Sequence, residues 1–382
     1  MRTFLLTILC LFAFSFHAKA DFLNLSRWSL SNNTTPWKQS FFSPNEYGPQ
    51  FAVPLIQGAP EGVYITVGTE RAFTVASSTP EISHLLIVDA DPMVILFNKI
   101  NIALLKASPS QKFFREFRLN PTPAGWIQVR NILESHGDKD SELFEEAKLS
   151  WWIQNSTTKS RNQHDISNWN RFYNFKEREY GFSRFNPKKR TNEYVMAFPF
   201  AETQYMFNKD AYKKISLMAK TGRIQVETAN FSDTSFLNLL NRELIRQNLP
   251  ITVLDISNCW KLAQYMSPYE FKNLIKALAP SMTEQSRLII SQAKSMAQYL
   301  AFRPLAYMQD HYGSDLQVLT DFIFAPESLL NSTSDLKLVE LVKQADQMKL
   351  SFLRFQLWEI SINQVVDQEK PKSRRNKCSS LF

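Results

Sequence analysis

Apolar and polar positions follow two different periods along this chain, and segments of the two kinds alternate. Short apolar runs bounded by polar or turn residues are typical of β-strands buried in a parallel sheet. Such runs predict strands at residues 63–68 (VYITVG), 84–91 (HLLIVDAD), 223–231 (RIQVETANF), 250–258 (PITVLDISN) and 287–293 (RLIISQA).

Between these runs, apolar residues recur with helical spacing. The first such helix has Pro92 at its first position, and a later one begins at Ser232 or Asp233, either of which can cap it. Gly222 is expected to end the helix before that. The spacing predicts helices at residues 92–108, 110–119, 208–222, 232–249 and 269–280.

Strands that alternate with helices predict an α/β fold with a Rossmann-like, doubly wound and mostly parallel sheet. Residues 122–205 interrupt this alternation with an aromatic, polar and irregular pattern, which we interpret as a largely helical insertion. The domain is expected over residues 60–325, after a lead segment at 21–59. A C-terminal helical segment at residues 326–366 and a basic disordered tail at 367–382 complete the expected organisation.

The first twenty residues have the pattern of a signal peptide. Arg2 is followed by an apolar run from Phe4 to Phe16 and by Ala18-Lys19-Ala20, a small-x-small cleavage signal. We predict cleavage after Ala20 and a secreted or periplasmic protein. No later apolar stretch approaches 18 residues, so no stable membrane span is expected after cleavage.

Composition narrows the classes of function. Hydrophobic residues at 44% and charged residues at 21% indicate a globular chain, and only nine glycines disfavour a glycine-rich pyrophosphate cradle. The net charge of +8 falls by two on signal cleavage. Basic runs at residues 186–190 and 369–377, and the aromatic–basic stretch 168–190, fit solvated surface better than nucleic-acid binding, which is the alternative.

Other enzyme chemistries lack their motifs. The sequence has no P-loop and no GxSxG elbow, and its histidines are scattered without metal-ligand spacing. We therefore expect no metal. Cys259 and Cys378 remain after cleavage and either pair or stay as thiols.

Polar residues and one glycine follow the ends of four predicted strands. The carboxyl ends of parallel strands meet at one edge of the sheet, where open α/β sheets bind ligands. Gly68 either makes a tight turn or lets a ligand approach the backbone. Asp89 can accept hydrogen bonds from a ribose diol or cap a helix, although Asp91 fits the cap better. The candidate residues are Gly68, Thr69, Glu70, Asp89, Asn230, Phe231, Asp255, Ser257 and Asn258.

The order of these strand ends resembles that of class I S-adenosylmethionine (SAM) methyltransferases. More narrowly, VYITVGTERAFT, LLIVDAD, GRIQVETANFSD and ITVLDISN resemble an uncharacterised bacterial family with a methyltransferase-like Rossmann fold. The blocks span residues 62–117 and 205–293, less than half the chain. Arg71-Ala72 stand in place of the family's Gln-Asn, Asp91 replaces its Arg, and Asn230 replaces an acid.

The resemblance implies a role for each candidate residue. Gly68, Thr69 and Glu70 would face the methionine part of SAM, with Glu70 on its amino group unless it is a solvated turn residue. Asp89 would hold the ribose hydroxyls. Asn230 and Phe231 would bracket the adenine, unless Phe231 belongs to the core. The substrate-facing residues would be Asp255, Ser257 and Asn258.

Two functions follow as hypotheses. The first is an exported methyltransferase-like protein that transfers a methyl group from SAM to an unknown acceptor, which can come from a host. The second is a non-catalytic, degenerate Rossmann protein that binds a small ligand or a partner protein. A buried Asp255 together with an open pocket lined by Gly68, Asp89 and Asn230 would favour a ligand site. A pocket plugged by aromatic side chains would favour the interaction protein.

Overall fold

The computed structural model describes residues 21–25, 40–44, 49, 52–156, 181–186, 191–196, 204–257, 259, 266–293, 297–308 and 320. Several predictions fall outside these residues: the signal peptide at 1–20, the C-terminal segment at 326–366, the tail at 367–382 and the candidate residue Asn258. Cys378, one half of the considered disulfide, also lies outside them.

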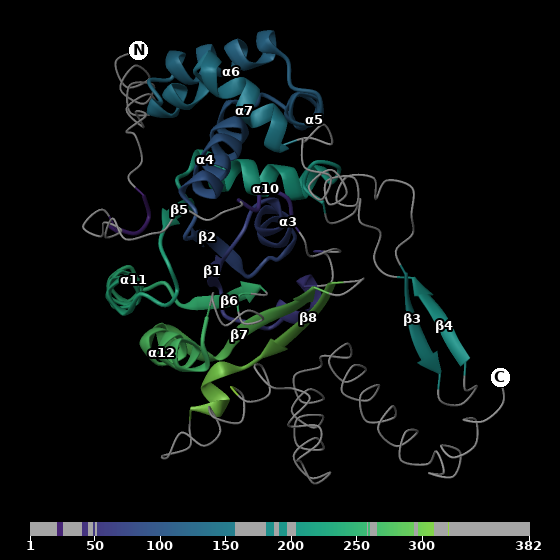
Figure 1. Ribbon diagram of the computed structural model, residues 1–382, viewed down its shortest axis with the longest axis vertical. Helices are drawn as coiled ribbons and strands as arrows, with labels where there is room; N and C mark the ends of the chain where they lie inside the picture. The colour runs from purple at the N-terminus through teal and green to yellow at the C-terminus, as the bar shows by residue number, and fades with distance from the viewer. Residues whose placement is uncertain are drawn as a thin grey trace, which may run out of the picture.

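A six-stranded sheet forms the centre of the molecule (Figure 1). Its order is β5-β2-β1-β6-β7-β8; the first five strands run parallel, and β8 is antiparallel to β7. The five parallel strands confirm the predicted Rossmann-like sheet, whereas β8 was not predicted. The strands are β1 (Gly62–Thr66), β2 (Ile82–Asp89), β5 (Ile224–Thr228), β6 (Ile251–Ser257), β7 (Met282–Ala293) and β8 (Ala297–Phe302).

Helices cover both faces of this sheet, so it is doubly wound (Figure 1). On one face α10 (Lys209–Lys220) packs against both α3 (Glu70–Ser78) and α4 (Pro92–Ala107). On the other face α11 (Thr234–Arg246) packs against α12 (Pro268–Leu278). A short helix, α2 (Val53–Ile56), precedes β1.

The predicted strand and helix signals explain these elements. Every residue of β1 and β6 is buried, as expected for central strands covered on both faces. Asp233, not Ser232, caps α11, because its side chain accepts the backbone N–H groups of Ser235 and Phe236. Gly222, in the left-handed region with φ of 67°, follows the end of α10 as predicted.

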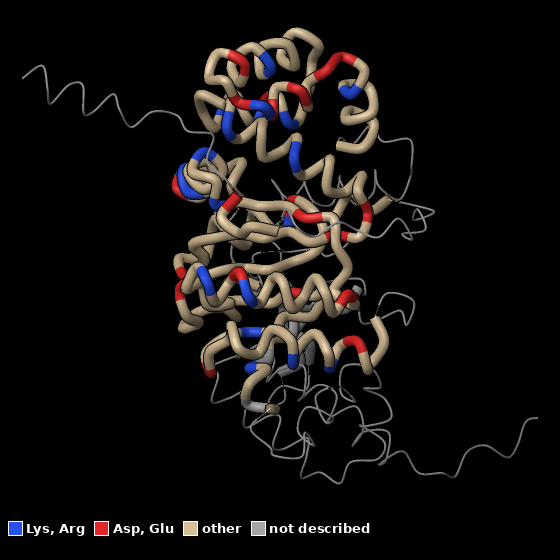
Figure 2. Tube along the Cα trace, turned by 90° about the vertical axis from the view of Figure 1, so that its left-hand side faces the viewer, with Lys and Arg blue, Asp and Glu red and all other residues tan. Residues whose placement is uncertain are grey.

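The predicted insertion, residues 122–205, shares an aromatic core with the helix before it, α5 (Gln111–Leu119). The described helices of the insertion are α6 (Pro123–Ser135), the 3₁₀ helix η2 (Lys139–Phe144) and α7 (Glu146–Ser156). Phe117 stacks on Trp152 at 5.7 Å between ring centroids, and Trp126 meets Phe144 at 4.5 Å. Acidic and basic residues are intermingled over these helices (Figure 2).

The insertion is largely helical, as predicted, but it also contains an antiparallel hairpin. Strands β3 (Gly181–Asn186) and β4 (Thr191–Met196) pair with each other in a separate two-stranded sheet. The two strands read GFSRFN and TNEYVM, and neither has a strict apolar–polar alternation, so the pattern did not distinguish strand from helix here.

Two pieces of the lead segment are built into the domain. Leu23 is fully buried, and the side-chain amide of Gln225 both donates to its carbonyl and accepts from its N–H, at 3.1 and 3.0 Å. This contact covers β5, an outer strand of the sheet. Phe42 is also buried, and its ring contacts Phe97 and Trp151. In the described part of the chain, no helix has the length and apolarity to span a membrane.

Candidate functional site

Gly68, Asp89 and Asn230 follow the ends of β1, β2 and β5, which are neighbours in the sheet. The three residues therefore lie along one stretch of its carboxyl edge. Each is partly exposed. The N–H of Ala229 donates to the backbone oxygen of Asp89 at 3.0 Å and ties the end of β5 to that of β2.

The turn at Gly68 requires glycine. Its φ of +90° lies in the region that L side chains rarely adopt, and the space where a Cβ would stand is open. The side chain of Asn98 in α4, which is fully buried, donates to the Gly68 carbonyl at 2.8 Å. Sequence reasoning missed Asn98, although an amide in the apolar run PMVILFNKINIALLKA was an available signal.

Asp89 presents a half-buried carboxylate that the backbone surrounds. It accepts the N–H of Asp91 at 2.9 Å. Burial raises the pKa of Asp89 to about 7, against the lowering effect of the N–H groups of Asp91, Gly68 and Ala90. Asp91 is the cap of α4, as the sequence predicted, because its Oδ1 accepts the N–H of Met93 at 2.8 Å.

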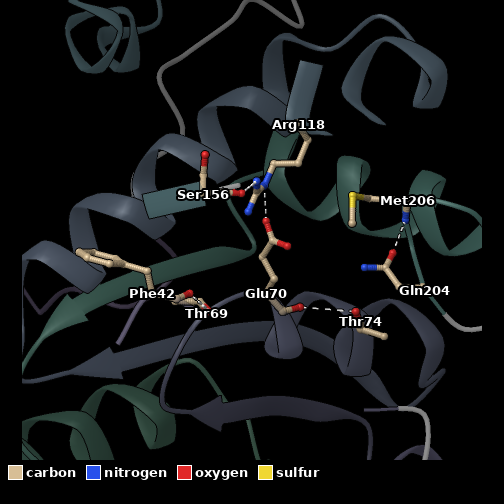
Figure 3. A network of polar contacts seen from close by, with 8 residues as sticks. All are labelled: Phe42, Thr69, Glu70, Thr74, Arg118, Ser156, Gln204 and Met206. Carbon is tan, nitrogen blue, oxygen red and sulfur yellow. Dashed lines mark hydrogen bonds and ion pairs between the residues drawn. The ribbon is translucent and has the colours of Figure 1, made fainter. Parts of the chain in front are cut away.

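Thr69 and Glu70 turn into the molecule instead of facing the edge (Figure 3). The Thr69 hydroxyl donates to the Phe42 carbonyl at 2.8 Å. The Glu70 side chain is fully buried and forms an ion pair with Nε of Arg118, which lies in α5, just before the insertion. The considered role of Glu70 as a solvated turn residue is therefore wrong.

Arg118 connects the insertion to the first turn of α3. Besides its ion pair with Glu70, it donates from Nη1 to the carbonyl of Ser156 at the end of α7 (Figure 3). Its guanidinium carbon lies 5.3 Å from the ring centroid of Trp152 and 5.7 Å from that of Phe97. The charge is thus buried among a carboxylate, a carbonyl and two aromatic rings.

The next residue along α3, Arg71, forms a second buried ion pair. Its Nη1 lies 2.8 Å from Oδ2 of Asp255, whose side chain is fully buried in β6. The Tyr64 hydroxyl donates to the same oxygen at 2.7 Å, and the N–H of Ser257 donates to Oδ1 at 2.8 Å. Burial is the largest cause that raises the pKa of Tyr64, and the charge of Asp255 adds to it.

The remaining candidates are divided between surface and core. The Asn230 side chain accepts the N–H of Ser232 at 3.0 Å, and Phe231 is buried with the core, as its alternative interpretation predicted. Ser257, at the end of β6, has φ of 52°, which is uncommon for a residue with a side chain. Its hydroxyl lies 3.4 Å from that of Ser291 in β7.

The structure thus separates the predicted residues into two groups. Those that are partly exposed on the carboxyl edge are Gly68, Asp89 and Asn230. Those buried directly behind it are Thr69, Glu70, Phe231, Asp255 and Ser257. Among the described residues, no three His, Cys, Asp or Glu side chains are grouped so that they could hold a metal ion.

Comparison with known families places this fold in one of them. A family model described as a domain of unknown function (DUF7790) matches residues 41–322, most of the chain. The chain therefore belongs to this family. The match begins beside Phe42, whose carbonyl accepts the Thr69 hydroxyl, so it includes the second described piece of the lead segment. A search of curated proteins gave no match.

Proposed function

We propose that this chain binds SAM at the carboxyl edge of its sheet and transfers the methyl group to an acceptor. One observation carries the proposal: Asp89, a partly exposed residue, holds its carboxylate at the tip of β2, next to the positive-φ turn at Gly68. In Rossmann sheets, an acid at the end of the second strand accepts hydrogen bonds from a ribose diol. The strand order β5-β2-β1-β6 supports the proposal, because it makes the strand ends that carry Asn230, Asp89 and Gly68 neighbours.

Each of the three edge residues has a distinct role in this proposal. Asp89 accepts the two ribose hydroxyls, and a charge-assisted pair of hydrogen bonds makes it the main determinant of affinity. Gly68 allows the backbone to approach the cofactor closely. Asn230 offers its amide N–H₂ to the adenine edge while its oxygen is held by the N–H of Ser232.

The chemistry of the transfer lies in the sulfonium of SAM, so the protein needs no nucleophile of its own. What the chain supplies is position. Asp255 and Ser257, at the end of β6, hold the backbone on the acceptor side through their buried hydrogen bonds. The acceptor is proposed to lie outside the producing cell, on the basis of the predicted export to a secreted or periplasmic location, and nucleic acid is not the favoured acceptor.

A second candidate function is supported by Glu70. The resemblance assigns this carboxylate to the amino group of the methionine moiety, yet it is fully buried in an ion pair with Arg118. If Glu70 does not contact the methionine moiety, the proposed site recognises only the ribose and the adenine. The chain would then be a non-catalytic protein that binds a nucleoside, or a partner that carries one.

Calorimetric titration of the chain from residue 21 onward tests the proposal. S-adenosylhomocysteine, SAM and adenosine would be titrated at pH 8 into the wild type, Asp89→Asn and Asp210→Asn. Asp210 has a side chain that is 90% exposed on α10 and controls for loss of one negative charge. We expect SAM binding that weakens at least tenfold in Asp89→Asn and is unchanged in Asp210→Asn, since the lost interactions are charge-assisted.

The three ligands distinguish the two candidates. SAM and S-adenosylhomocysteine that bind at least tenfold more tightly than adenosine support methyl transfer, because the methionine part is then recognised. Equal affinity for adenosine favours the non-catalytic nucleoside protein. If none of the three binds at millimolar concentration, both candidates are wrong.

A further inference from the structure

The amino edge of the same sheet gathers charges that the proposed cofactor site does not use. Glu61 and Glu81 immediately precede β1 and β2, and Arg223 immediately precedes β5. Lys214 of α10 feels the charges of all three. Two more arginines lie toward this end of the sheet: Arg287 is in β7, opposite Val253, the third residue of β6, and Arg303 immediately follows β8. These groups are four cations and two carboxylates, and a third carboxylate, the exposed Glu284, lies near the start of β7.

Arg287 and Arg303 are cross-strand neighbours. Leu288 pairs with Phe302 in the β7–β8 ladder; Arg287 precedes the first of these residues and Arg303 follows the second. Like charges placed opposite each other in an antiparallel pair repel. The fold nevertheless buries Arg287, which is 2% exposed, and leaves Arg303 partly exposed beside it.

Neither guanidinium has a carboxylate partner among the described residues. Arg287 donates from its terminal nitrogens to two backbone carbonyls, those of Gln285 and Gln57, the latter at 3.3 Å. Its Nε and the Nε of Arg303 are buried nitrogens for which the described residues provide no hydrogen-bond acceptor. Buried charged donors of this kind are costly unless an anion accompanies them.

Electrostatics point to a missing negative charge. Burial, and then the nearby charge of Arg303, lower the pKa of Arg287 to about 10, while Glu81 alone raises it. Glu81 is itself engaged, because its Oε1 accepts the N–H of Gly58 at 3.2 Å. It forms no ion pair within 4.0 Å with either arginine in the described structure, so the carboxylate that acts on Arg287 does so from a longer distance.

We infer that Arg287 and Arg303 form a binding site for a phosphate-type oxyanion at the amino edge of the sheet. The anion reaches the pair from the side of Arg303, the partly exposed member. The planar fork of a guanidinium matches the oxygens of a tetrahedral oxyanion. Arg287 adds a buried charge behind it, where solvent screens the attraction least. This site lies at the opposite edge from Asp89, so it is separate from the proposed cofactor site.

Direct binding measurements test this inference. Inorganic phosphate and glycerol 3-phosphate would be titrated calorimetrically into the wild type, Arg303→Gln and Arg130→Gln at constant ionic strength set with sodium chloride. Arg130 is an exposed arginine on α6 that pairs with Glu134 of the same helix, so its variant controls for loss of one positive charge. We expect Arg303→Gln to weaken phosphate binding at least tenfold and Arg130→Gln to leave it unchanged.

Two further arms distinguish the source of the anion and exclude general salt effects. Tighter binding of glycerol 3-phosphate than of inorganic phosphate indicates a phosphate carried by a larger molecule, and the reverse order indicates the free ion; both support the site. Arg303→Lys keeps the charge without the fork and is expected to have intermediate affinity. The inference is overturned if neither ligand binds the wild type at tens of millimolar, or if Arg303→Gln binds phosphate as well as the wild type.

Discussion

At the carboxyl edge of the sheet, the buried charges next to Gly68 are paired within the fold, whereas toward the amino edge Arg287 and Arg303 form no ion pair with a described carboxylate. Glu70 and Arg71 are adjacent in α3 and pair in opposite directions, with Arg118 of α5 and Asp255 of the sheet. Arg287 and Arg303 instead face each other across a strand pair. The comparison separates charges that the fold neutralises internally from charges that we propose a ligand neutralises.

On the carboxyl edge, Asp89 is the candidate residue whose carboxylate has no cationic partner among the described residues. Its hydrogen bonds come from backbone N–H groups, and burial holds its pKa near 7 in place of an ordinary value near 4. A carboxylate kept in this state destabilises the free protein. It is therefore a reasonable place to look for a ligand that uses it.

We expect the largest loss of unfolding free energy from a substitution that breaks a buried ion pair at the carboxyl edge. Arg118→Ala removes the partner of Glu70, the hydrogen bond to Ser156 and two ring contacts. Leaving a carboxylate buried without its partner costs about 3–5 kcal/mol of unfolding free energy. Urea denaturation monitored by circular dichroism measures this loss.

A control on the same helix sharpens this result. Lys112 in α5 forms an exposed ion pair with Glu116, at 3.8 Å. Lys112→Ala is expected to change the unfolding free energy by less than about 1 kcal/mol, since solvent screens such pairs. Equal losses of unfolding free energy in the two variants would show that the buried Glu70–Arg118 pair stabilises the fold no more than an exposed ion pair does.

The second-largest expected effect is that of Asp89 on the unfolding free energy of the ligand-free protein. The folded state binds the Asp89 proton more tightly than the unfolded state does, because burial raises its pKa from 3.8 to about 7. Unfolding free energy therefore falls as pH rises through this window. Asp89→Asn removes that cost and is expected to stabilise the protein at pH 8 by roughly 1–3 kcal/mol, less than the full shift because the side chain is partly exposed.

The gain should shrink as pH falls and become small near pH 4, where Asp89 is protonated in the folded state and about half protonated in the unfolded state. Urea denaturation of wild type, Asp89→Asn and Asp210→Asn at pH 8 and pH 4 tests the sign. If Asp89→Asn is less stable than the wild type at pH 8, the Asp89 carboxylate stabilises the fold, and it is not a group held at a cost to stability.

The smallest expected effect is the pH dependence of cofactor binding. Because the carboxylate accepts the ribose hydroxyls, only its ionised form binds them well. With a pKa of about 7, the ionised fraction of Asp89 rises about tenfold between pH 6 and pH 8. We expect the affinity for S-adenosylhomocysteine to rise by a similar factor in the wild type. The affinity of Asp89→Asn should stay constant over this range.

The sequence predicts the parts of this molecule that local pattern determines. Apolar runs located the five parallel strands, and turn and cap residues such as Gly68, Asp91 and Asp233 located the ends of elements. The strand β8 was missed because it follows β7 after a short connection and has no flanking pattern of its own. The hairpin in the insertion was missed because aromatic residues suit helices and strands alike.

The site was only partly predictable because its partners are distant in sequence. Glu70 and Arg118 are 48 residues apart, and Tyr64 and Asp255 are 191 residues apart. Without these pairings, a polar residue after a strand end looks the same whether it faces a ligand or an internal arginine. The same holds for Arg287 and Arg303, whose closeness follows from the unpredicted pairing of β8 with β7.

A crystal structure of the chain from residue 21 onward, grown with S-adenosylhomocysteine at pH 8, tests the central claim most directly. The account predicts the nucleoside at the carboxyl edge between β1, β2 and β5, with both ribose hydroxyls within hydrogen-bond distance of the Asp89 carboxylate. A nucleoside bound elsewhere, or ribose hydroxyls that make no contact with Asp89, would contradict it.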